Sequence, residues 1–589
     1  MSLHPPYREA AEQWLDEDPD PKTRAELAAL IASYDAGDAK ARDQLREMFH
    51  GSLEFGTAGL RGILGPGPQR MNRVLVRKVT AGLAAYLRAH VADVAQRGVV
   101  IGYDGRHNSR VFAEDTARVL AGAGIPALIA HRPWPTPTTA WAVVDRGCAA
   151  GVMVTASHNP PAYNGYKVYW GNGAQIIPPH DTGIAAAIAL IGRSDRLAMP
   201  ELEAARRDRL VIDLDEALHD RYLTAAIALR EPPLHDGAKL AIAFTPMHGV
   251  GARSTEPIFA RTGYANVHTV PEQREPDPDF STVAFPNPEE KGAMDLVLAL
   301  ARTIDAELVL ANDPDADRLA VAVPDPASPT KYRQLTGDQV GALFGDYLLE
   351  VGANQPGDAA GGAKLNTRRM VATTIVSSQL LSYLAKAAGA DYRETLTGFK
   401  WIGNAAMDYE RTTGGRFVMG YEEALGYSIG PLVRDKDGVS ACLIFADLVL
   451  WNRARGRSVL DHLDDIYRRV GLFVTEQVSI TKPGSEGHAQ ITQAMDRFRT
   501  QPPQQIAGHA VAQVVDLAKG EGGLPPSDVL VFKLEGGRRV IMRPSGTEPK
   551  LKSYYEVRVP VAPGEPIDAA RTRGTTELAE LRDAHQKLI

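Results

Sequence analysis

The sequence predicts an α/β protein built from three similar α/β domains with mixed sheets, followed by a smaller α+β domain. The main observation is an alternation of helical segments with short apolar runs, which restarts after about residue 210 and again near residue 336. Runs of roughly four to eight residues bounded by Gly or Pro are typical of buried strands in a mostly parallel sheet. The second observation is length, because 589 residues exceed the roughly 100–200 residues of a single domain.

The strand and helix patterns place the expected domain boundaries. The segments VVIGYD (99–104), GVMVTA (151–156) and AELVLAN (306–312) read as strands between helices, and residues Lys22 to Phe49 have helical apolar spacing. The last 120 or so residues change character and suggest the α+β domain. We therefore expect a helical extension over residues 1–50, α/β domains over 51–210, 211–335 and 336–465, and the α+β domain over 466–589.

Composition excludes several classes of protein. A hydrophobic content of 44% with 23% charged residues is that of a globular chain and not a disordered one. The net charge is −7 without a basic stripe, which argues against nucleic-acid binding. Two cysteines exclude a disulfide framework and suit a reducing compartment. Neither a signal peptide nor an apolar run long enough for a bilayer is visible, so we expect a cytoplasmic protein with no membrane partner.

The most specific motif is a set of alternating aspartates, Asp313, Asp315 and Asp317, directly after the run AELVLAN. Side chains at i, i+2 and i+4 share one face of an extended segment, so these carboxylates are expected to converge. Converging carboxylates repel unless a cation lies among them, and oxygen ligands favour Mg²⁺ or Ca²⁺. An EF-hand loop is excluded because Arg318 and Pro324 occupy its required Gly and Glu positions. A solvated acidic turn is the alternative, but ligand sites of α/β proteins form at strand ends.

A second motif, Thr155-Ala156-Ser157-His158-Asn159-Pro160, also follows an apolar run. It would expose Ser157 to a crevice with His158 beside it as a proton carrier. The segment is not a G-x-S-x-G nucleophile elbow, and an ordinary turn capped by Ser and Asn is an equal alternative. The segment from Asn164 to Lys167 reads as a turn that could bring an amine back toward Ser157.

Two further motifs suit polar ligands but are weak when taken alone. Glu422 and Glu423 lie in the Gly-flanked segment GYEEALG, which is followed by RDKDG, and carboxylates there could accept hydrogen bonds from sugar hydroxyls. The segment RPSGTEPK, which starts at Arg543, combines Arg, hydroxyls and Gly as an anion-binding concavity does, although a plain β-turn is an equal alternative. Neither a Walker-type phosphate loop nor a G-x-G-x-x-G segment after a strand occurs.

Together and in this order, TASHNP, DPDADR, GYEEALG and RPSGTEPK resemble the α-D-phosphohexomutase superfamily, which includes phosphoglucomutases and phosphomannomutases. GTAGLRG (56–62) and TGFKWIG (397–403) also match segments of that family, so the resemblance runs from about residue 50 to 560. It implies four domains around a central cleft and a phosphosugar mutase that works through a phosphoserine.

The resemblance also implies roles for individual residues. Ser157 would be the phosphoserine, and Asp313, Asp315 and Asp317 would bind Mg²⁺ together with an oxygen of that phosphoserine. His158, Lys167 and Arg318 would surround the reacting phosphoryl group, with Lys167 or His158 as the base. The residues implied to bind substrate are Thr57, Arg61, Lys400, Glu422, Lys436, Arg543, Ser545, Gly546 and Thr547.

The implied reaction interconverts glucose 1-phosphate and glucose 6-phosphate, with glucose 1,6-bisphosphate as intermediate and activator. Ala424 stands where many relatives carry a serine, which leaves strict glucose preference open. EEALGY with RDKDGVSA resembles most the branch of phosphoglucomutase-2 and phosphopentomutase, so phosphopentomutase, phosphomannomutase and glucose 1,6-bisphosphate synthase are alternatives. A non-catalytic sugar-phosphate sensor fits least, because it needs neither Ser157 nor the aspartates. We expect small-molecule sugar phosphates as partners and a monomer or homodimer.

Overall fold

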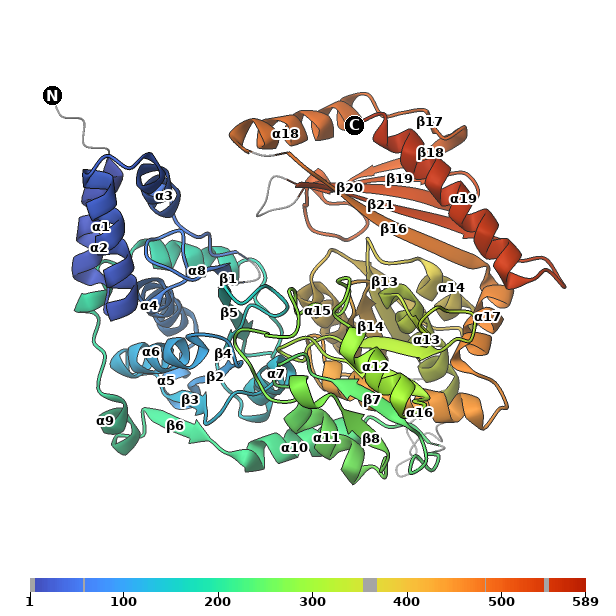
Figure 1. Cartoon of the computed structure of the whole chain (residues 1–589), viewed down its shortest axis with the longest axis horizontal. Helices are drawn as coiled ribbons and strands as arrows, with labels where there is room; N and C mark the ends of the chain where they lie inside the picture. Colours follow the sequence, from blue (N-terminus) through green and yellow to red (C-terminus); the bar gives the residue numbers. More distant parts are fainter. Residues whose placement is uncertain (1–5, 57–58, 233, 353–367, 483, 545–549) are drawn as a thin grey trace. The chain divides into compact units, whose positions relative to one another are not determined.

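The computed structural model describes residues 6–56, 59–232, 234–352, 368–482, 484–544 and 550–589. The chain divides into two compact units, and the residues of each unit pack mainly against residues of the same unit. Unit 1 consists of residues 1–335 and 425–450, and unit 2 of residues 336–424 and 451–589. Figure 1 gives the element labels used below.

Unit 1 begins with three helices that pack against one another (Figure 1, dark blue). Asp20 and Asp38 cap two of them by accepting hydrogen bonds from the backbone N–H groups of Lys22 and Lys40. Their apolar side chains form one buried cluster together with Val74 of α4 (Arg73–His90), which fixes the extension to the first α/β domain. The helices are α1 (Pro6–Glu17), α2 (Pro21–Asp35) and α3 (Ala39–Phe49).

The first sheet has six strands in the order β1-β5-β4-β2-β3-β6. Its strands β4, β2, β3 and β6 are parallel, whereas β5 runs antiparallel to both β4 and β1. The turn expected over residues 164–167 is therefore wrong, because these residues lie inside β5. The strands are β1 (Leu60–Ile63), β2 (Val99–Tyr103), β3 (Ala127–Ala130), β4 (Ala150–Val154), β5 (Tyr163–Trp170) and β6 (Val211–Leu214).

Helices connect these strands and pack on the sheet, as the alternation in the sequence predicts. Buried side chains line the sides of α4, α6 and α7 that face the other elements of this domain. The helices after α4 are α5 (Val94–Arg97), α6 (Ser109–Gly122), α7 (Thr136–Asp145), α8 (His180–Ala189), α9 (Leu202–Arg207) and α10 (Glu216–Ile227), with a short 3₁₀ helix at Ser194–Arg196.

The second sheet of unit 1 has the order β11-β10-β9-β7-β8. Strands β9, β7 and β8 are parallel, and β10 and β11 add antiparallel pairs at one side. The aspartate motif follows β9 directly. The elements are β7 (Ile242–Thr245), α11 (Ala252–Arg261), β8 (Val267–Thr269), a 3₁₀ helix (Pro271–Gln273), α12 (Asp295–Thr303), β9 (Leu308–Ala311), β10 (Ala320–Pro324) and β11 (Tyr332–Gln334).

A later segment of the chain completes unit 1. It contains β15 (Gly426–Ile429) and the first part of α16 (Gly438–Arg453), whose residues up to Leu450 belong to this unit. An isolated bridge joins Gly426 to Arg318, and the backbone N–H of Leu319 donates to Leu425. Residues 425–438 are thereby held against the loop that carries the aspartates.

Unit 2 holds a parallel set of strands in the order β13-β12-β14 and an antiparallel sheet in the order β16-β21-β20-β19-β18-β17. Helix α19 packs along the antiparallel sheet on β16 and β21 (Figure 1, red). The elements before that sheet are α13 (Gly337–Val351), β12 (Arg369–Thr374), α14 (Leu380–Ala387), β13 (Asp391–Thr395), α15 (Phe399–Thr413), β14 (Arg416–Glu422) and α17 (Val459–Val470).

The C-terminal part of unit 2 meets the parallel part through an apolar cluster. Ile375, Val376 and Leu396, which follow β12 and β13, pack against Ile541 and Tyr554 of the antiparallel sheet. Its elements are β16 (Leu472–Thr481), α18 (Gly484–Thr500), β17 (Gln505–Ile506), β18 (His509–Asp516), a 3₁₀ helix (Leu517–Lys519), β19 (Leu530–Leu534), β20 (Arg538–Pro544), β21 (Lys550–Val559) and α19 (Ile567–Gln586).

The predicted α/β class with mixed sheets and a C-terminal α+β part is confirmed. The exact domain boundaries stay predictions. In the part of the chain that the structure describes, no helix combines the length and the apolar character that crossing a bilayer requires.

Candidate active site

Ser157 lies in a tight loop just after β4, with its side chain buried. Its backbone has a φ of 53°, in the left-handed region that a non-glycine residue rarely adopts. The hydroxyl of Thr155 accepts a 2.8 Å hydrogen bond from the backbone N–H of Ser157 and stabilises this conformation. Such backbone strain clusters at functional sites, where surrounding contacts compensate it.

The Ser157 hydroxyl points into the aspartate cluster. Its Oγ donates a 2.7 Å hydrogen bond to Oδ2 of Asp313 and lies 3.2 Å from Nδ1 of His158. The serine motif and the aspartate motif are more than 150 residues apart in the sequence. The fold therefore brings together the two strand-end motifs that the sequence analysis singled out.

Asp313, Asp315 and Asp317 are buried, and each offers a carboxylate oxygen within 4.8 Å of the others. The expectation of an extended segment is wrong, because Ala316 has a φ of 55° and its backbone N–H donates to the carbonyl of Asp313 at 2.8 Å. The segment is a turn, and the turn brings the carboxylates together.

Two lysines compensate the negative charge of this cluster. Lys167 Nζ lies 2.8 Å from Oδ2 of Asp315 and 2.9 Å from Oδ2 of Asp317, and Lys436 Nζ lies 3.3 Å from the same Asp317 oxygen. Burial opposes charge on Asp315, yet Lys167 outweighs it and lowers the pKa of that carboxyl. Burial, together with the neighbouring carboxylates, raises the pKa of Asp313 well above its usual value.

The cluster has the donors that a hard divalent cation needs. Oδ1 of Asp315 and Oδ1 of Asp317 are buried and accept no hydrogen bond from any residue that the structure describes. Buried oxygens without a hydrogen-bond partner are costly, and three converging carboxylates are typical ligands of Mg²⁺ or Ca²⁺. The residues present therefore fit a metal ion.

Arg106 holds the serine loop, and the sequence analysis missed it. Its buried guanidinium donates to the backbone carbonyls of Ser157 at 2.5 Å, Asn159 at 2.6 Å and Pro160 at 3.0 Å, and pairs with Asp104 at 3.3 Å. Asp104 and Arg106 directly follow β2. Because ligand sites of α/β proteins form at strand ends, their position in the sequence could have identified them as candidates.

Two other predicted residues, Arg318 and Arg61, lie near the same loop, which itself carries His158. Arg318 Nε lies 3.8 Å from Oδ2 of Asp313, and Arg61 Nη1 donates to Oδ1 of Asn159 at 2.9 Å. Burial, followed by the positive charges of Arg318 and Arg61, lowers the pKa of His158 well below its usual value. His158 is therefore a neutral imidazole at neutral pH, with one nitrogen able to accept a proton.

Lys436 is positioned by residues that the sequence analysis did not single out. Asp435 lies 3.5 Å from Lys436 Nζ and accepts hydrogen bonds from the hydroxyl of Tyr169 at 2.9 Å and from Gln175 at 2.7 Å. Gly426 leaves room for this lysine, because a Cβ there would lie 2.3 Å from the Lys436 side chain. Asp435 stands beside Lys436 in the RDKDG segment, but only the fold shows which charges it contacts.

Unit 2 holds a second group of predicted residues. Glu422, at the end of β14, accepts a 2.7 Å hydrogen bond from the backbone N–H of Gly398, and Glu423 accepts one of 2.8 Å from the hydroxyl of Ser377. Arg543 donates to the hydroxyl of Thr397. Lys400 is buried in the first turn of α15. Four predicted residues lie outside the described ones, namely Thr57, Ser545, Gly546 and Thr547.

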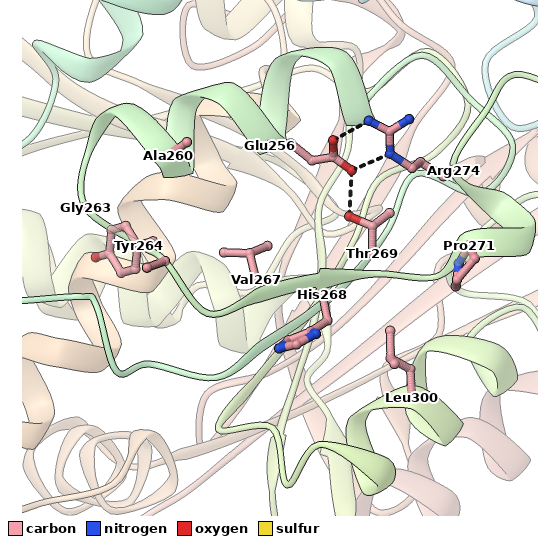
Figure 2. A pocket seen from close by; sticks show the side chains of 11 residues that line it. Glu256, Ala260, Gly263, Tyr264, Val267, His268, Thr269, Pro271, Arg274 and Leu300 are labelled. Carbon is pink, nitrogen blue, oxygen red and sulfur yellow. Dashed lines mark hydrogen bonds and ion pairs between the residues drawn. The ribbon is translucent and has the colours of Figure 1, made fainter.

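A hollow of about 760 Å³ lies elsewhere in unit 1, beside β8. Figure 2 shows that Glu256 pairs there with Arg274 and accepts a hydrogen bond from Thr269. Its charged groups thus already satisfy one another, and its lining contains none of the predicted site residues.

Four family models match the chain in succession. They describe the domains of phosphoglucomutase/phosphomannomutase: α/β/α domain I over residues 52–193, domain II over 220–326, domain III over 336–470, and the C-terminal domain over 494–569. The chain belongs to the α-D-phosphohexomutase superfamily. It is therefore an enzyme of the phosphotransferase mutase type.

Relatives of this phosphohexomutase carry several names. It is 42% identical over 492 residues to a probable phosphomannomutase of Haemophilus influenzae, covering 83% of this chain and 93% of that protein. It is 35% identical over 590 residues to the phosphopentomutase of Homo sapiens, covering 94% and 92%. It is 34% identical over 526 residues to a phosphoglucomutase of Staphylococcus epidermidis, covering 87% and 92%.

The fold of the phosphohexomutase also resembles that of a solved structure. A putative phosphomannomutase from Thermus thermophilus matches with a TM-score of 0.67 at 22% identity, covering 91% of this chain and 99% of that one. This likeness shows the shared fold.

The Glu423 carboxyl should make the stability of unit 2 depend on pH. Burial and the charge of Glu422 raise its pKa from 4.5 to about 7. The folded state thus binds the proton more tightly, so the stabilisation is complete below pH 4.5 and is lost as the pH rises to about 7. Glu423→Gln should therefore raise the melting temperature at pH 8.5 more than at pH 5. The corresponding gain in the free energy of unfolding at pH 8.5 has an upper limit of about 3 kcal/mol. Because the side chain is only partly buried, the gain should fall below this limit.

Scanning calorimetry at both pH values checks this expectation, with the exposed Glu535→Gln as control. An equal shift at pH 5 and pH 8.5 would show that Glu423 is already charged without penalty in the folded protein.

Proposed function

We propose that this phosphohexomutase interconverts glucose 1-phosphate and glucose 6-phosphate through a phosphoserine at Ser157. The observation that carries the proposal is the 2.7 Å hydrogen bond from Ser157 Oγ to Asp313, inside a buried carboxylate cluster that fits a cation. A serine on a strained strand-end loop beside such a cluster suits phosphoryl transfer, which depends on alignment and charge neutralisation.

Asp313, Asp315 and Asp317 would hold Mg²⁺, which when bound draws charge from the oxygens of the phosphoserine. The substrate hydroxyl attacks the phosphorus of the phosphorylated Ser157, the bond from phosphorus to Oγ breaks, and the hydroxyl proton passes to His158. Lys167, the other predicted base, is an ammonium paired with Asp315 and Asp317 and would have to lose its own proton first. The product is glucose 1,6-bisphosphate. After the bisphosphate turns around, Ser157 Oγ attacks its other phosphorus, the bond from that phosphorus to the sugar oxygen breaks, and the sugar oxygen takes up the proton from the base. Glucose 6-phosphate leaves, and Ser157 is again phosphorylated.

The remaining predicted residues take the following roles in this proposal. Arg318, with its guanidinium beside Asp313 and Asp317, neutralises charge on the transferring group. Glu422 accepts hydrogen bonds from sugar hydroxyls. The phosphate that is not transferred, and the rest of the substrate, are bound by Thr57, Arg61, Lys400, Lys436, Arg543, Ser545, Gly546 and Thr547.

A pentose phosphate is the second candidate substrate, and two observations favour it. Ala424 leaves the segment GYEEALG (420–426), called the sugar loop below, without the hydroxyl that a serine would offer. Two relatives that cover 94% of this chain are the human phosphopentomutase and, at 36% identity over 580 residues, a probable phosphoribomutase of Schizosaccharomyces pombe. We therefore propose that ribose 1-phosphate is also turned over. A cytoplasmic location and a monomeric or dimeric state stay predictions.

Replacing the nucleophile tests the proposed function. Ser157→Ala should lower mutase turnover by several orders of magnitude, because the variant lacks the hydroxyl that carries the phosphoryl group in transit. Intact-mass spectrometry after incubation with glucose 1,6-bisphosphate should show one added phosphate on the wild type and none on the variant.

Ser281→Ala, which alters a serine on an exposed turn, is the matched control and should keep both the phosphate and the activity. A phosphate that persists on the Ser157→Ala protein would assign the phosphoserine elsewhere.

Sugar choice is tested by comparing kcat/KM for glucose 1-phosphate and ribose 1-phosphate. A hydroxyl that hydrogen-bonds substrate contributes about 0.5–1.5 kcal/mol, or roughly threefold to tenfold in discrimination. Ala424→Ser should therefore shift the ratio toward glucose by no more than about tenfold, and the wild type should use both sugars. If the wild-type enzyme does not turn over ribose 1-phosphate, this account of the sugar loop is refuted. The assignment of the phosphoserine to Ser157 would still stand.

A further inference from the structure

Strand β20 of unit 2 carries two arginines on one face, Arg539 and Arg543. They are four positions apart, and side chains at even spacing on a strand point to the same side. Arg538, the neighbour of Arg539, points to the opposite side and pairs with Glu577 of α19. Arg539 has no role in the function proposed above, yet it is 4% exposed. A buried guanidinium is costly unless carboxylates balance its charge and acceptors take up its hydrogen bonds.

The guanidinium of Arg539 clamps the loop that follows β12. Nη1 donates to the carbonyl of Ile375 at 2.9 Å, and Nη2 donates to the carbonyl of Ser377. Its charge is balanced by Glu556, its direct partner on β21, at 3.2 Å, and by Glu394, also at 3.2 Å. The planar guanidinium holds its donors in a rigid fork and so fixes the two carbonyls at a set spacing, whereas the donors of a lysine ammonium rotate about a single nitrogen.

The clamped loop in turn holds a glutamate of the sugar loop. The hydroxyl of Ser377 donates to Oε2 of Glu423 at 2.8 Å and accepts the backbone N–H of Glu423 at 3.1 Å. Ser377 therefore grips Glu423 at both its side chain and its backbone. Because Arg539 fixes the Ser377 carbonyl, the chain of contacts runs from β20 through Ser377 to Glu423.

A second chain of contacts starts at the other arginine of β20. Arg543 donates to the hydroxyl of Thr397, and the next residue, Gly398, donates its backbone N–H to Glu422 at 2.7 Å. Gly398 has a φ of 109°, which an L side chain rarely adopts, so this turn depends on glycine. Each glutamate of the sugar loop is thus tied through one loop to one arginine of β20.

An apolar cluster lies between the two chains of contacts. Ile375, Leu396 and Trp401 pack with Ile541, which stands between the two arginines on β20. Close-packed side chains transmit small displacements instead of absorbing them. A shift of β20 is therefore passed to both loops together.

We propose that Arg539 is a positioning residue for sugar recognition, acting through Ser377 on Glu423. Strand β20 then couples Arg543, which is proposed to bind the phosphate that is not transferred, to Glu422 and Glu423 of the sugar loop. This inference rests on the proposed function, because it assumes that the sugar loop binds substrate hydroxyls.

A double-mutant cycle on Arg539→Lys and Ser377→Ala tests the chain of contacts. Each single variant should raise KM for glucose 1-phosphate roughly threefold to tenfold, the effect of one lost hydrogen bond to substrate, and leave kcat within about twofold. Lost binding in the ground and transition states alike raises KM alone. The double variant should be no worse than the more impaired single variant, because both changes disable the same path.

Arg538→Lys is the matched control, since it makes the same change one residue away on the opposite face of β20 and should leave KM and kcat unaltered. Additive effects of Arg539→Lys and Ser377→Ala would overturn the proposal, and so would a Ser377→Ala enzyme with wild-type KM. In either case Arg539 would serve only the packing of unit 2.

If Arg539→Lys does not fold, Glu556→Gln replaces it in the cycle, because that change loosens the same guanidinium while keeping its fork. The same expectations and the same contradicting result then apply. A wild type without mutase activity on any sugar phosphate would refute the proposed function, whereas an active wild type with additive effects would refute only the positioning role.

Discussion

The structure of unit 1 depends on one electrostatic constraint, the burial of three carboxylates in a single turn. Uncompensated, Asp313, Asp315 and Asp317 would repel one another at high cost in a poorly solvated site. The ammonium groups of Lys167 and Lys436 supply positive charge within 3.3 Å of the cluster. Lys167 reaches the cluster from β5, and Lys436 reaches it from the segment after β15. The pairing of β5 in the first sheet and the return of the chain to unit 1 therefore both place a positive charge beside the aspartates. Oδ1 of Asp315 and Oδ1 of Asp317, which accept no hydrogen bond from the described residues, are where a cation fits.

The same organisation recurs at two loops that follow strands, in each of which a buried arginine holds the backbone. Arg106 does this for the Ser157 loop through three carbonyls, and Arg539 does it for the Ser377 loop through two. Loops carry mobile polar groups, and a forked donor that satisfies several carbonyls removes that freedom. Pre-organisation of this kind suits phosphoryl transfer, in which alignment supplies much of the rate.

Local patterns in the sequence predicted the α/β class, the strand-end position of Ser157 and the convergence of the aspartates. They failed where the answer depends on distant residues. The extended geometry expected for 313–317 was wrong because Ala316 adopts a left-handed turn, and the turn expected at Lys167 is a strand because residues 163–170 pair with both β4 and β1. Arg106 and Arg539 escaped notice because their partners lie some 50 and 160 residues away, beyond any spacing rule.

Thermal unfolding with and without Mg²⁺ tests most directly the claim that the carboxylate cluster is built for a cation. A ligand that binds only the folded state stabilises it by RT ln(1 + [L]/Kd) and so raises its melting temperature. After treatment with a chelator and its removal, added Mg²⁺ should raise the melting temperature of the wild-type protein and have a much smaller effect on Asp315→Asn. A melting temperature of the wild type that does not change with Mg²⁺, or an equal rise in both proteins, would contradict the account.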